Sequence, residues 1–197
     1  MELSLVIPVW NDRDGVIRLL QQIGEWDCFS QIIIVDDASD EEMSPDTLPG
    51  AKGVRDRISY LRLPDQRGAG HARNAGLDLV QGDHVIFFDS DDLFGNDFVP
   101  LVHLASGHDF DFLIFRHNDS RMTDSGQTGT FPVEEGYWTA IEATPEPRLL
   151  GPSQAAILCR LANYPWNKIY RTAFLRDNRI RCTETMVHND IELHWAS

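Results

Sequence analysis

Apolar runs of strand length alternate with stretches of helical periodicity over the first hundred residues, and this alternation constrains the fold most. Continuous apolar runs occupy 3–9, 31–35 and 84–88, and a weaker one occupies 58–63. Runs without polar alternation are typical of strands buried on both faces of a parallel sheet. Helical spacing of apolar residues follows the run 3–9 and precedes the run 84–88. We therefore predict an α/β chain, a three-layer α/β/α sandwich around a mostly parallel central sheet.

The helices of this first part have local signals. Asp12 or Asp14 is the candidate N-cap of a helix that ends near Trp26. A second helix over 70–80 is predicted to bury one face, made of Ala72, Ala75, Gly76 and Leu79.

Beyond residue 95 the signals are weaker. We predict a helix capped by Asn96, a strand at 110–115, and loops at 118–130 and 144–152 on either side of a weak amphipathic piece. The remaining predictions are an extended piece at 166–170 and helices at 153–161, 172–178 and from Asp190 onward. The last helix meets no stop signal before Ser197, so we expect the natural protein to continue.

Charge and composition exclude several classes of protein. The formal net charge of −14 argues against a nucleic-acid partner, because such partners require clustered Lys and Arg. A chain this acidic repels anions at long range, so a phosphate site needs its own local positive charge. Three cysteines without close spacing fit a reducing, cytoplasmic compartment. No transmembrane segment or basic leader is predicted.

An acidic turn, Asp89-Ser90-Asp91-Asp92, directly follows the apolar run 84–88. In extended backbone Asp89 and Asp91 face the same side, and two carboxylates suit Mg²⁺ or Mn²⁺. An EF-hand loop fails here, because Phe94 occupies the position that requires glycine. A solvated turn that caps a helix remains the alternative at this point.

Two other segments lie where a parallel sheet places its ligands, beyond the strand ends. Small residues and two arginines occupy 66–76 at a predicted helix start, where free N–H groups favour anions. Alternatively, Arg73 and Asn74 tie that helix to a neighbouring loop. Asp36 and Asp37 end the run 31–35, either as a turn or as acceptors for a nucleobase or ribose.

Four segments together resemble the successive signatures of the family 2 glycosyltransferases. They are IPVWN at 7–11, VDDAS at 35–39, ARNAG at 72–76 and FDSDD at 88–92. The resemblance implies the GT-A fold, a Rossmann-like nucleotide-binding architecture, with a nucleotide-sugar-binding core at 1–117. Residues 118–197 are expected to form the acceptor side of the same domain. A divalent metal, Mn²⁺ or Mg²⁺, and inversion at the anomeric carbon are also implied.

The same resemblance assigns roles to single residues. It implies that Asp91 ligates the metal and that Asp89 faces the ribose. The other donor-binding residues that it implies, around the base and the diphosphate, are Pro8, Asp36, Asp37, Gly68, Arg73 and Asn74.

The last third resembles the family more loosely, through PWNKIYR at 165–171 and MVHNDI at 186–191. Asp190 matches the catalytic base, while Asn189 stands where relatives usually carry Glu. Without the resemblance, Asp190 is an ordinary helix cap. Candidate further contacts are Asp92, Trp166, Lys168 and His188, with His188 or His194 as an alternative third metal ligand.

The expected function is transfer of a sugar from a nucleotide-sugar donor, a UDP-sugar first, to a hydroxyl of a surface polysaccharide or lipid-linked glycan. The resemblance places this acceptor at the inner face of a bacterial plasma membrane, which implies peripheral membrane association. A sugar-1-phosphate nucleotidylyltransferase is a weaker alternative, since it needs a glycine-rich loop where 11–15 stands. A catalytically silent nucleotide-sugar or glycan-binding module is the other alternative.

Overall fold

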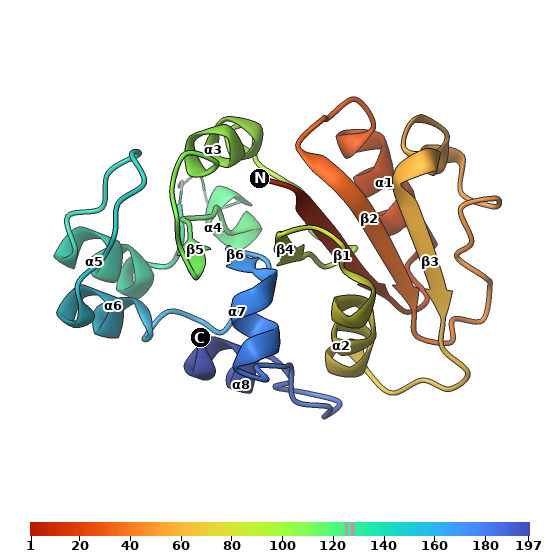
Figure 1. Cartoon of the computed structure of the whole chain (residues 1–197). Coiled ribbons are helices and arrows are strands. Elements are labelled where there is room, and N and C mark those ends of the chain that lie inside the picture. Colours follow the sequence, from red (N-terminus) through yellow and green to blue (C-terminus); the bar gives the residue numbers. More distant parts are fainter. Residues whose placement is uncertain (125, 127–128) are drawn as a thin grey trace.

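A central sheet runs through the molecule, which we describe from a computed structural model for residues 1–124, 126 and 129–197 (Figure 1). Within these residues the sheet has six strands in the order β3-β2-β1-β4-β6-β5. The strands are β1 (Leu3–Val9), β2 (Phe29–Asp36), β3 (Ile58–Arg62), β4 (His84–Phe87), β5 (Phe112–Ile114) and β6 (Lys168–Arg171). β1 to β4 are mutually parallel, while β6 runs antiparallel to both of its neighbours.

The helices of the described residues are α1 (Arg13–Ile23), α2 (Ala69–Leu79), α3 (Phe98–Ala105), α4 (Ser120–Asp124), α5 (Pro132–Ala140), α6 (Pro152–Leu158), α7 (Thr172–Asp177) and α8 (Ile191–Ala196). α1 and α3 cover one face of the sheet, and α2, α7 and α8 cover the other. α5 and α6 pack against each other to one side of the sheet (Figure 1). Two short 3₁₀ turns, η1 (Pro49–Gly53) and η2 (Arg55–Arg57), lead into β3.

Successive side chains of each inner strand point into different cores, as pleated backbone requires. Leu5 and Ile7 of β1 pack with α1 and α3, whereas Val6 packs with α2, α7 and α8. Ile34 and Val35 of β2 divide in the same way. Because both faces are covered, the apolar runs are continuous, and the predicted three-layer sandwich with a mostly parallel sheet is confirmed.

The predicted buried face of α2 is wrong at its end. Leu79 is 39% exposed, while Arg73, Asn74 and Leu77 are buried. The helix has two neighbours, the sheet through Gly76 and the segment 182–190 through Gly70, so its buried arc is wider than one apolar stripe. Polar residues fill the part of that arc that faces the segment.

The loop predicted at 118–130 is also wrong in part, because α4 occupies Ser120–Asp124. Residues 125, 127 and 128 of that prediction lie outside the described residues. The other predicted loop, 144–152, ends at Pro152, which starts α6 as a first-turn proline. Among the described residues, no helix is long and apolar enough to cross a membrane.

β6 brings the last third of the chain into the same sheet, between β4 and β5. Tyr170 pairs with Val85 on one side and with Phe112 on the other. β4 therefore lies between β1 of the first part of the chain and β6 of the last third. A division at residue 117 stays a prediction.

Candidate functional site

A pocket opens where β1 and β4 stop pairing. Their ladder ends at Val6 and Phe87, with one further hydrogen bond from the Phe88 N–H to the Val6 carbonyl. Pro8 lies two residues further along β1 and has no N–H to donate. Because β4 no longer pairs with β1 at this point, no hydrogen bond of the sheet is lost. This is the point at which the strand order turns from β2 and β3 to β4, the usual ligand position in open α/β sheets.

The pocket has a volume of about 490 Å³ and draws on four parts of the chain. They are the end of β1 with the residues just after it, Asp37 after β2, the first turns of α2 and the acidic turn after β4. Its lining residues are Pro8, Val9, Trp10, Asp12, Asp37, Ala69, Ala72, Arg73, Asp89, Ser90 and Asp91. Five of the residues singled out from sequence thus lie together here: Pro8, Asp37, Arg73, Asp89 and Asp91.

Sequence reasoning missed several lining residues, among them Asp12 and Ser90. The Ser90 hydroxyl donates to the Asp12 carboxylate over 2.6 Å, which joins the acidic turn to the start of α1. Asp12 also caps that helix by accepting from the Gly15 N–H. Its position just past the end of β1 was the signal that could have placed it in the pocket.

The acidic turn gathers three carboxylates, those of Asp89, Asp91 and Asp92. Burial, together with the charges of Asp89 and Asp91, raises the pKa of Asp92 to about 7. The side chain of Asp89 contacts Arg73, whereas Asp91 is exposed at the pocket. Among the described residues, no three His, Cys, Asp or Glu side chains are grouped as a complete metal site. Mg²⁺ is usually held by one or two carboxylates plus substrate phosphates, so this turn fits such an ion.

Asp37 organises the entry to α2. Its carboxylate accepts from the backbone N–H groups of Arg67 and Gly68, at 2.9 and 2.7 Å. Gly68 has a φ of 90°, a conformation that a side chain would strain. The glycine therefore lets the chain turn into the first helical turn, whose Ala69 lines the pocket.

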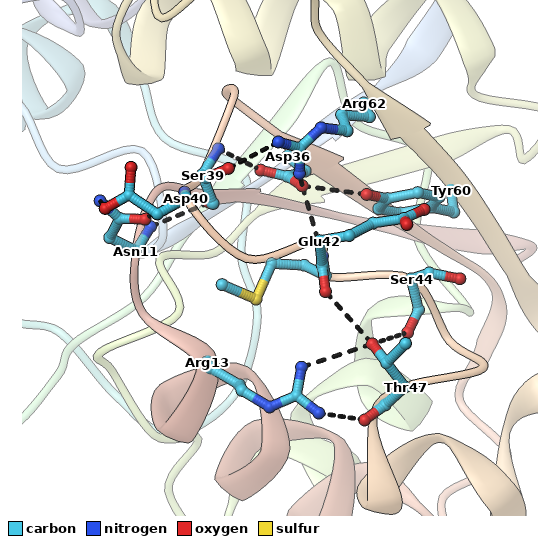
Figure 2. A network of polar contacts seen from close by, with 11 residues as sticks. Asn11, Arg13, Asp36, Ser39, Asp40, Glu42, Ser44, Thr47, Tyr60 and Arg62 are labelled. Atoms are coloured by element: carbon cyan, nitrogen blue, oxygen red, sulfur yellow. Dashed lines mark hydrogen bonds and ion pairs between the residues drawn. The ribbon is translucent and has the colours of Figure 1, made fainter.

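Asp36, the residue before Asp37, lies among polar side chains of the loop after β2 and of β3 (Figure 2). It is completely buried and accepts hydrogen bonds from the N–H groups of Ser39 and Met43, the Tyr60 hydroxyl and the Arg62 guanidinium. Burial raises its pKa, but these hydrogen bonds outweigh burial and lower it below the ordinary value. Its acceptor capacity is used within the protein, so it holds the loop after β2 in shape and does not line the pocket.

The loop after β2 is also fastened to the end of β1. The Asn11 side chain donates to the Asp40 carboxylate and accepts from the Asp40 N–H, at 3.1 and 2.7 Å (Figure 2). The Asn11 N–H donates to the Ser39 hydroxyl. These contacts hold the chain between Trp10 and Asp12, which line the pocket.

Arg73 joins the pocket to the last segment of the chain. Arg73 is buried, with 3% of its surface exposed. Its Nη2 donates to Asp89 Oδ1 over 2.5 Å. Nη1 donates to Asn189 Oδ1 over 2.6 Å and lies 3.3 Å from Asp190 Oδ1. The predicted base is therefore held beside the acidic turn, although the two are about a hundred residues apart in sequence.

Asp190 does not behave as an ordinary helix cap. It stands at the N-cap position of α8, but its side chain makes no capping hydrogen bond. Burial raises its pKa, the Arg73 charge lowers it and the Asp89 charge raises it, with a net raised pKa. Such a carboxylate is a stronger proton acceptor than a solvated one.

Asn74 ties α2 to the segment that carries Asp190. Its amide donates to the Cys182 carbonyl and accepts from the Cys182 N–H, both over 2.9 Å. Gly70 allows close approach, since a Cβ there would stand 2.2 Å from the Thr183 carbonyl oxygen. Asn74 thus makes the contact that the sequence left open as its alternative role.

The other predicted contacts lie away from the pocket. Lys168 is buried and donates to the Tyr164 carbonyl and Asn167 Oδ1, and burial lowers its pKa to about 7. Trp166 stacks on Tyr164 and, with Asp92, lines a second hollow of about 820 Å³. That hollow is larger than the first but lacks Asp89, Asp91 and Arg73.

Neither histidine lines the pocket. His188 is exposed with a φ of 57°, and His194 is buried against the Cys159 carbonyl. No third metal ligand from these two residues is present in the described geometry.

The fold and the pocket at its switch point define a GT-A architecture. The crystal structure of Staphylococcus aureus TarS in complex with UDP matches with a TM-score of 0.70 and 25% identity, over 98% of this chain and 54% of that chain. A mannosyltransferase, PcManGT from Pyrobaculum calidifontis, in complex with GDP-Man and Mn²⁺, matches at 15% identity with a TM-score of 0.63, over 97% and 50%. This second likeness concerns the fold alone.

A family model, glycosyl transferase family 2, matches residues 4–148. The chain belongs to this family. Among curated proteins, the poly(ribitol-phosphate) beta-N-acetylglucosaminyltransferase TarS of Staphylococcus aureus is 26% identical over 189 residues, 94% of this chain and 30% of TarS. The chain spans between 30% and 54% of three curated relatives that it matches.

Proposed function

We propose that this protein transfers a sugar from a UDP-sugar to a hydroxyl group of a glycan acceptor, with inversion at the anomeric carbon. The observation that carries the proposal is Arg73, which holds Asp89 of the pocket and Asp190 in one hydrogen-bonded group. A donor in the pocket therefore has a half-buried carboxylate beside it that can accept a proton. Family membership favours this reaction over nucleotidyl transfer.

In this proposal different residues contact the nucleobase, the ribose and the diphosphate of the donor. Pro8 and Asp37 border the nucleobase end, and Asp89 faces the ribose in this proposal. The diphosphate lies by the first turn of α2, at Ala69, where helix N–H groups favour anions; Gly68 lets the chain turn into that helix. The choice of UDP is supported by the structure of TarS in complex with UDP, which matches 98% of this chain.

Asp91 is the proposed metal ligand, because it is exposed at the pocket and stands between two further carboxylates, Asp89 and Asp92. When bound, Mn²⁺ or Mg²⁺ neutralises charge on the departing diphosphate. The first turn of α2, through Ala69, orients the same end of the donor. The proposed ligand set is Asp91 and the donor phosphates, with no histidine.

Asp190 acts as the base in this scheme. It accepts the proton of the acceptor hydroxyl while the oxygen attacks the anomeric carbon and the nucleoside diphosphate leaves. One displacement of this kind inverts the configuration. Asn189, beside it, is neutral and keeps Arg73 in place without competing for the proton.

The acceptor is proposed to be a surface polysaccharide or a lipid-linked glycan at the inner face of the membrane. Support comes from TarS, whose name describes transfer to poly(ribitol-phosphate). Residues 118–197 form the proposed acceptor side, since β6 and α8 bring Asp190 to the pocket from that region.

A thermal-shift panel of UDP-, GDP- and dTDP-sugars with and without Mn²⁺ tests the donor. A ligand that binds the folded state raises Tm by mass action, so we expect UDP-sugars with Mn²⁺ to give the largest rise. UDP release and NMR of the product anomer then test turnover and inversion. Metal-dependent binding without UDP release, even with acceptor, would mean a binding module, and no rise with any nucleotide sugar contradicts the proposal.

A further inference from the structure

We propose that Arg73 is a positioning residue for Asp190 and that Asn189 sets its charge balance, so that the two together hold the base ready beside the donor. The inference rests on the proposed function. The contacts that keep Asp190 in place and ionised lie within this chain, so they do not depend on which donor and acceptor it uses.

The geometry of the guanidinium is the first support. Its two Nη atoms reach three oxygen atoms from two separate segments, Asp89 after β4 and Asn189 with Asp190 before α8. A planar fork with fixed donor directions makes such a bridge, and a lysine ammonium cannot reproduce it. Arg73 is itself fixed, because it lies on the buried side of α2 next to Ala72, which is packed against the sheet.

Asn74 adds a second constraint on the same two segments. Its amide is paired with both backbone groups of Cys182, seven residues before Asn189. Arg73 and Asn74 are adjacent on one helix, so the backbone tie and the guanidinium contact reinforce each other. The segment with the base is thus held at two points on α2.

The charges around Asp190 are the second support. The ionisable groups that face it are Arg73 from α2, Asp89 after β4, Lys168 from β6 and His188 just before it. Burial and Asp89 favour its protonated form, while Arg73, Lys168 and His188 favour the carboxylate. Arg73 makes the closest of these contacts and already serves two carboxylates.

Asn189 therefore has a definite electrostatic role. It accepts the shortest hydrogen bond of Nη1, 2.6 Å, and contributes no charge. A carboxylate at this position would compete for the same guanidinium. It would add a third negative charge around Arg73, besides those of Asp89 and Asp190. Like charges at such distances raise a carboxyl pKa, so the base would be protonated over a wider pH range.

The test uses Asn189→Asp, nearly the same shape with one added charge, and Arg73→Lys, which keeps the charge but loses the fork. The control is Arg181→Lys. Arg181 pairs with Asp78 and so links α2 to the same C-terminal segment, but at the surface. The carboxyl signal of Asp190, assigned with Asp190→Asn, is titrated by carbon NMR in the metal-free, ligand-free protein.

We expect Asn189→Asp to raise the apparent pKa of Asp190 by about one unit and Arg181→Lys to leave it unchanged. With UDP-GlcNAc and Mn²⁺ as the probe, Arg73→Lys should lower kcat roughly a hundredfold, with KM for the donor changed by less than about threefold. The acid limb of the kcat profile should follow the NMR pKa.

An unchanged Asp190 titration in Asn189→Asp would overturn the charge argument. An Arg73→Lys protein with the same kcat and acid limb as Arg181→Lys would overturn the positioning role. These results are distinct from failure of the proposed function, which would appear as undiminished transfer by Asp190→Asn. Thermal unfolding of each variant separates loss of the fold from loss of positioning.

Discussion

Replacing Asn74 with alanine separates its role as a tie from a role as a donor contact. The amide donates to and accepts from the Cys182 backbone over 2.9 Å in a buried site. Truncation leaves a buried carbonyl and a buried N–H without partners. Each costs about 1–3 kcal/mol, so we expect Asn74→Ala to lower the free energy of unfolding by about 3 kcal/mol.

Urea unfolding followed by circular dichroism measures this loss. The matched control is Asn178→Ala, an exposed amide that donates to the Phe174 carbonyl, for which we expect less than about 0.5 kcal/mol. UDP affinity in the presence of Mn²⁺ should change little in folded Asn74→Ala, while kcat falls because the segment 182–190 is released. Native stability together with a tenfold loss of UDP affinity would refute the tie and make Asn74 a donor contact.

Three further predictions concern single carboxylates. Asp190→Asn should lower kcat by about 10²- to 10⁴-fold at unchanged UDP affinity, and wild-type kcat should fall as the pH drops through the raised pKa of Asp190; equal loss of affinity in calorimetry would contradict a base. Asp91→Asn should remove the Mn²⁺-dependent rise in Tm with UDP and keep the metal-free Tm; an intact rise would exclude Asp91 as the ligand. The lowered pKa of Asp36 stabilises the fold above the pKa of the unfolded chain, and this contribution is lost as the pH falls toward the folded pKa. Urea unfolding between about pH 3 and 7 should therefore show a steeper acid loss in wild type than in Asp36→Asn, and parallel curves would contradict it.

The parallel part of the sheet could be predicted from sequence, because strands buried on both faces appear as continuous apolar runs. Every residue of β1 is buried, and the run 3–9 is correspondingly apolar apart from Ser4 and Pro8. The position of the pocket followed from the same strands, since ligands in such sheets lie beyond the carboxyl ends. Asp37, Asp89 and Asp91 lie there, as the strand ends required.

The insertion of β6 between β4 and β5, antiparallel to both, has no comparable sequence pattern. The strand is only four residues long, and its partners are β4 and β5, far from it in sequence. Its neighbours in space depend on long-range packing that local patterns do not contain. The contact of Arg73 with Asn189 and Asp190 depends on that packing as well, so sequence alone supplied the residues but not the bridge.

The difference between Asp36 and Asp37 illustrates the same limit. Both follow the same strand, and either could have faced a ligand. Four donors from the following loop and β3 converge on Asp36, whereas the donors to Asp37 come from the turn before α2 at the pocket. Which of two adjacent carboxylates has all its acceptor positions used is decided by the loop after β2 and by its packing on β3, neither of which a local sequence pattern contains.

Charge in the pocket argues for a metal independently of family resemblance. Among the described residues, the lining contains the four carboxylates Asp12, Asp37, Asp89 and Asp91 against one guanidinium, Arg73, and the chain as a whole carries −14. A nucleoside diphosphate brings further negative charge into this field, so its binding without a cation is opposed both locally and at long range. We therefore expect calorimetry to detect UDP binding with Mn²⁺ and at least a tenfold weaker affinity with EDTA, and the difference to shrink in Asp91→Asn. Equal affinity in both conditions would mean that Arg73 and the first turn of α2 hold the diphosphate alone, and that the acidic turn serves another purpose.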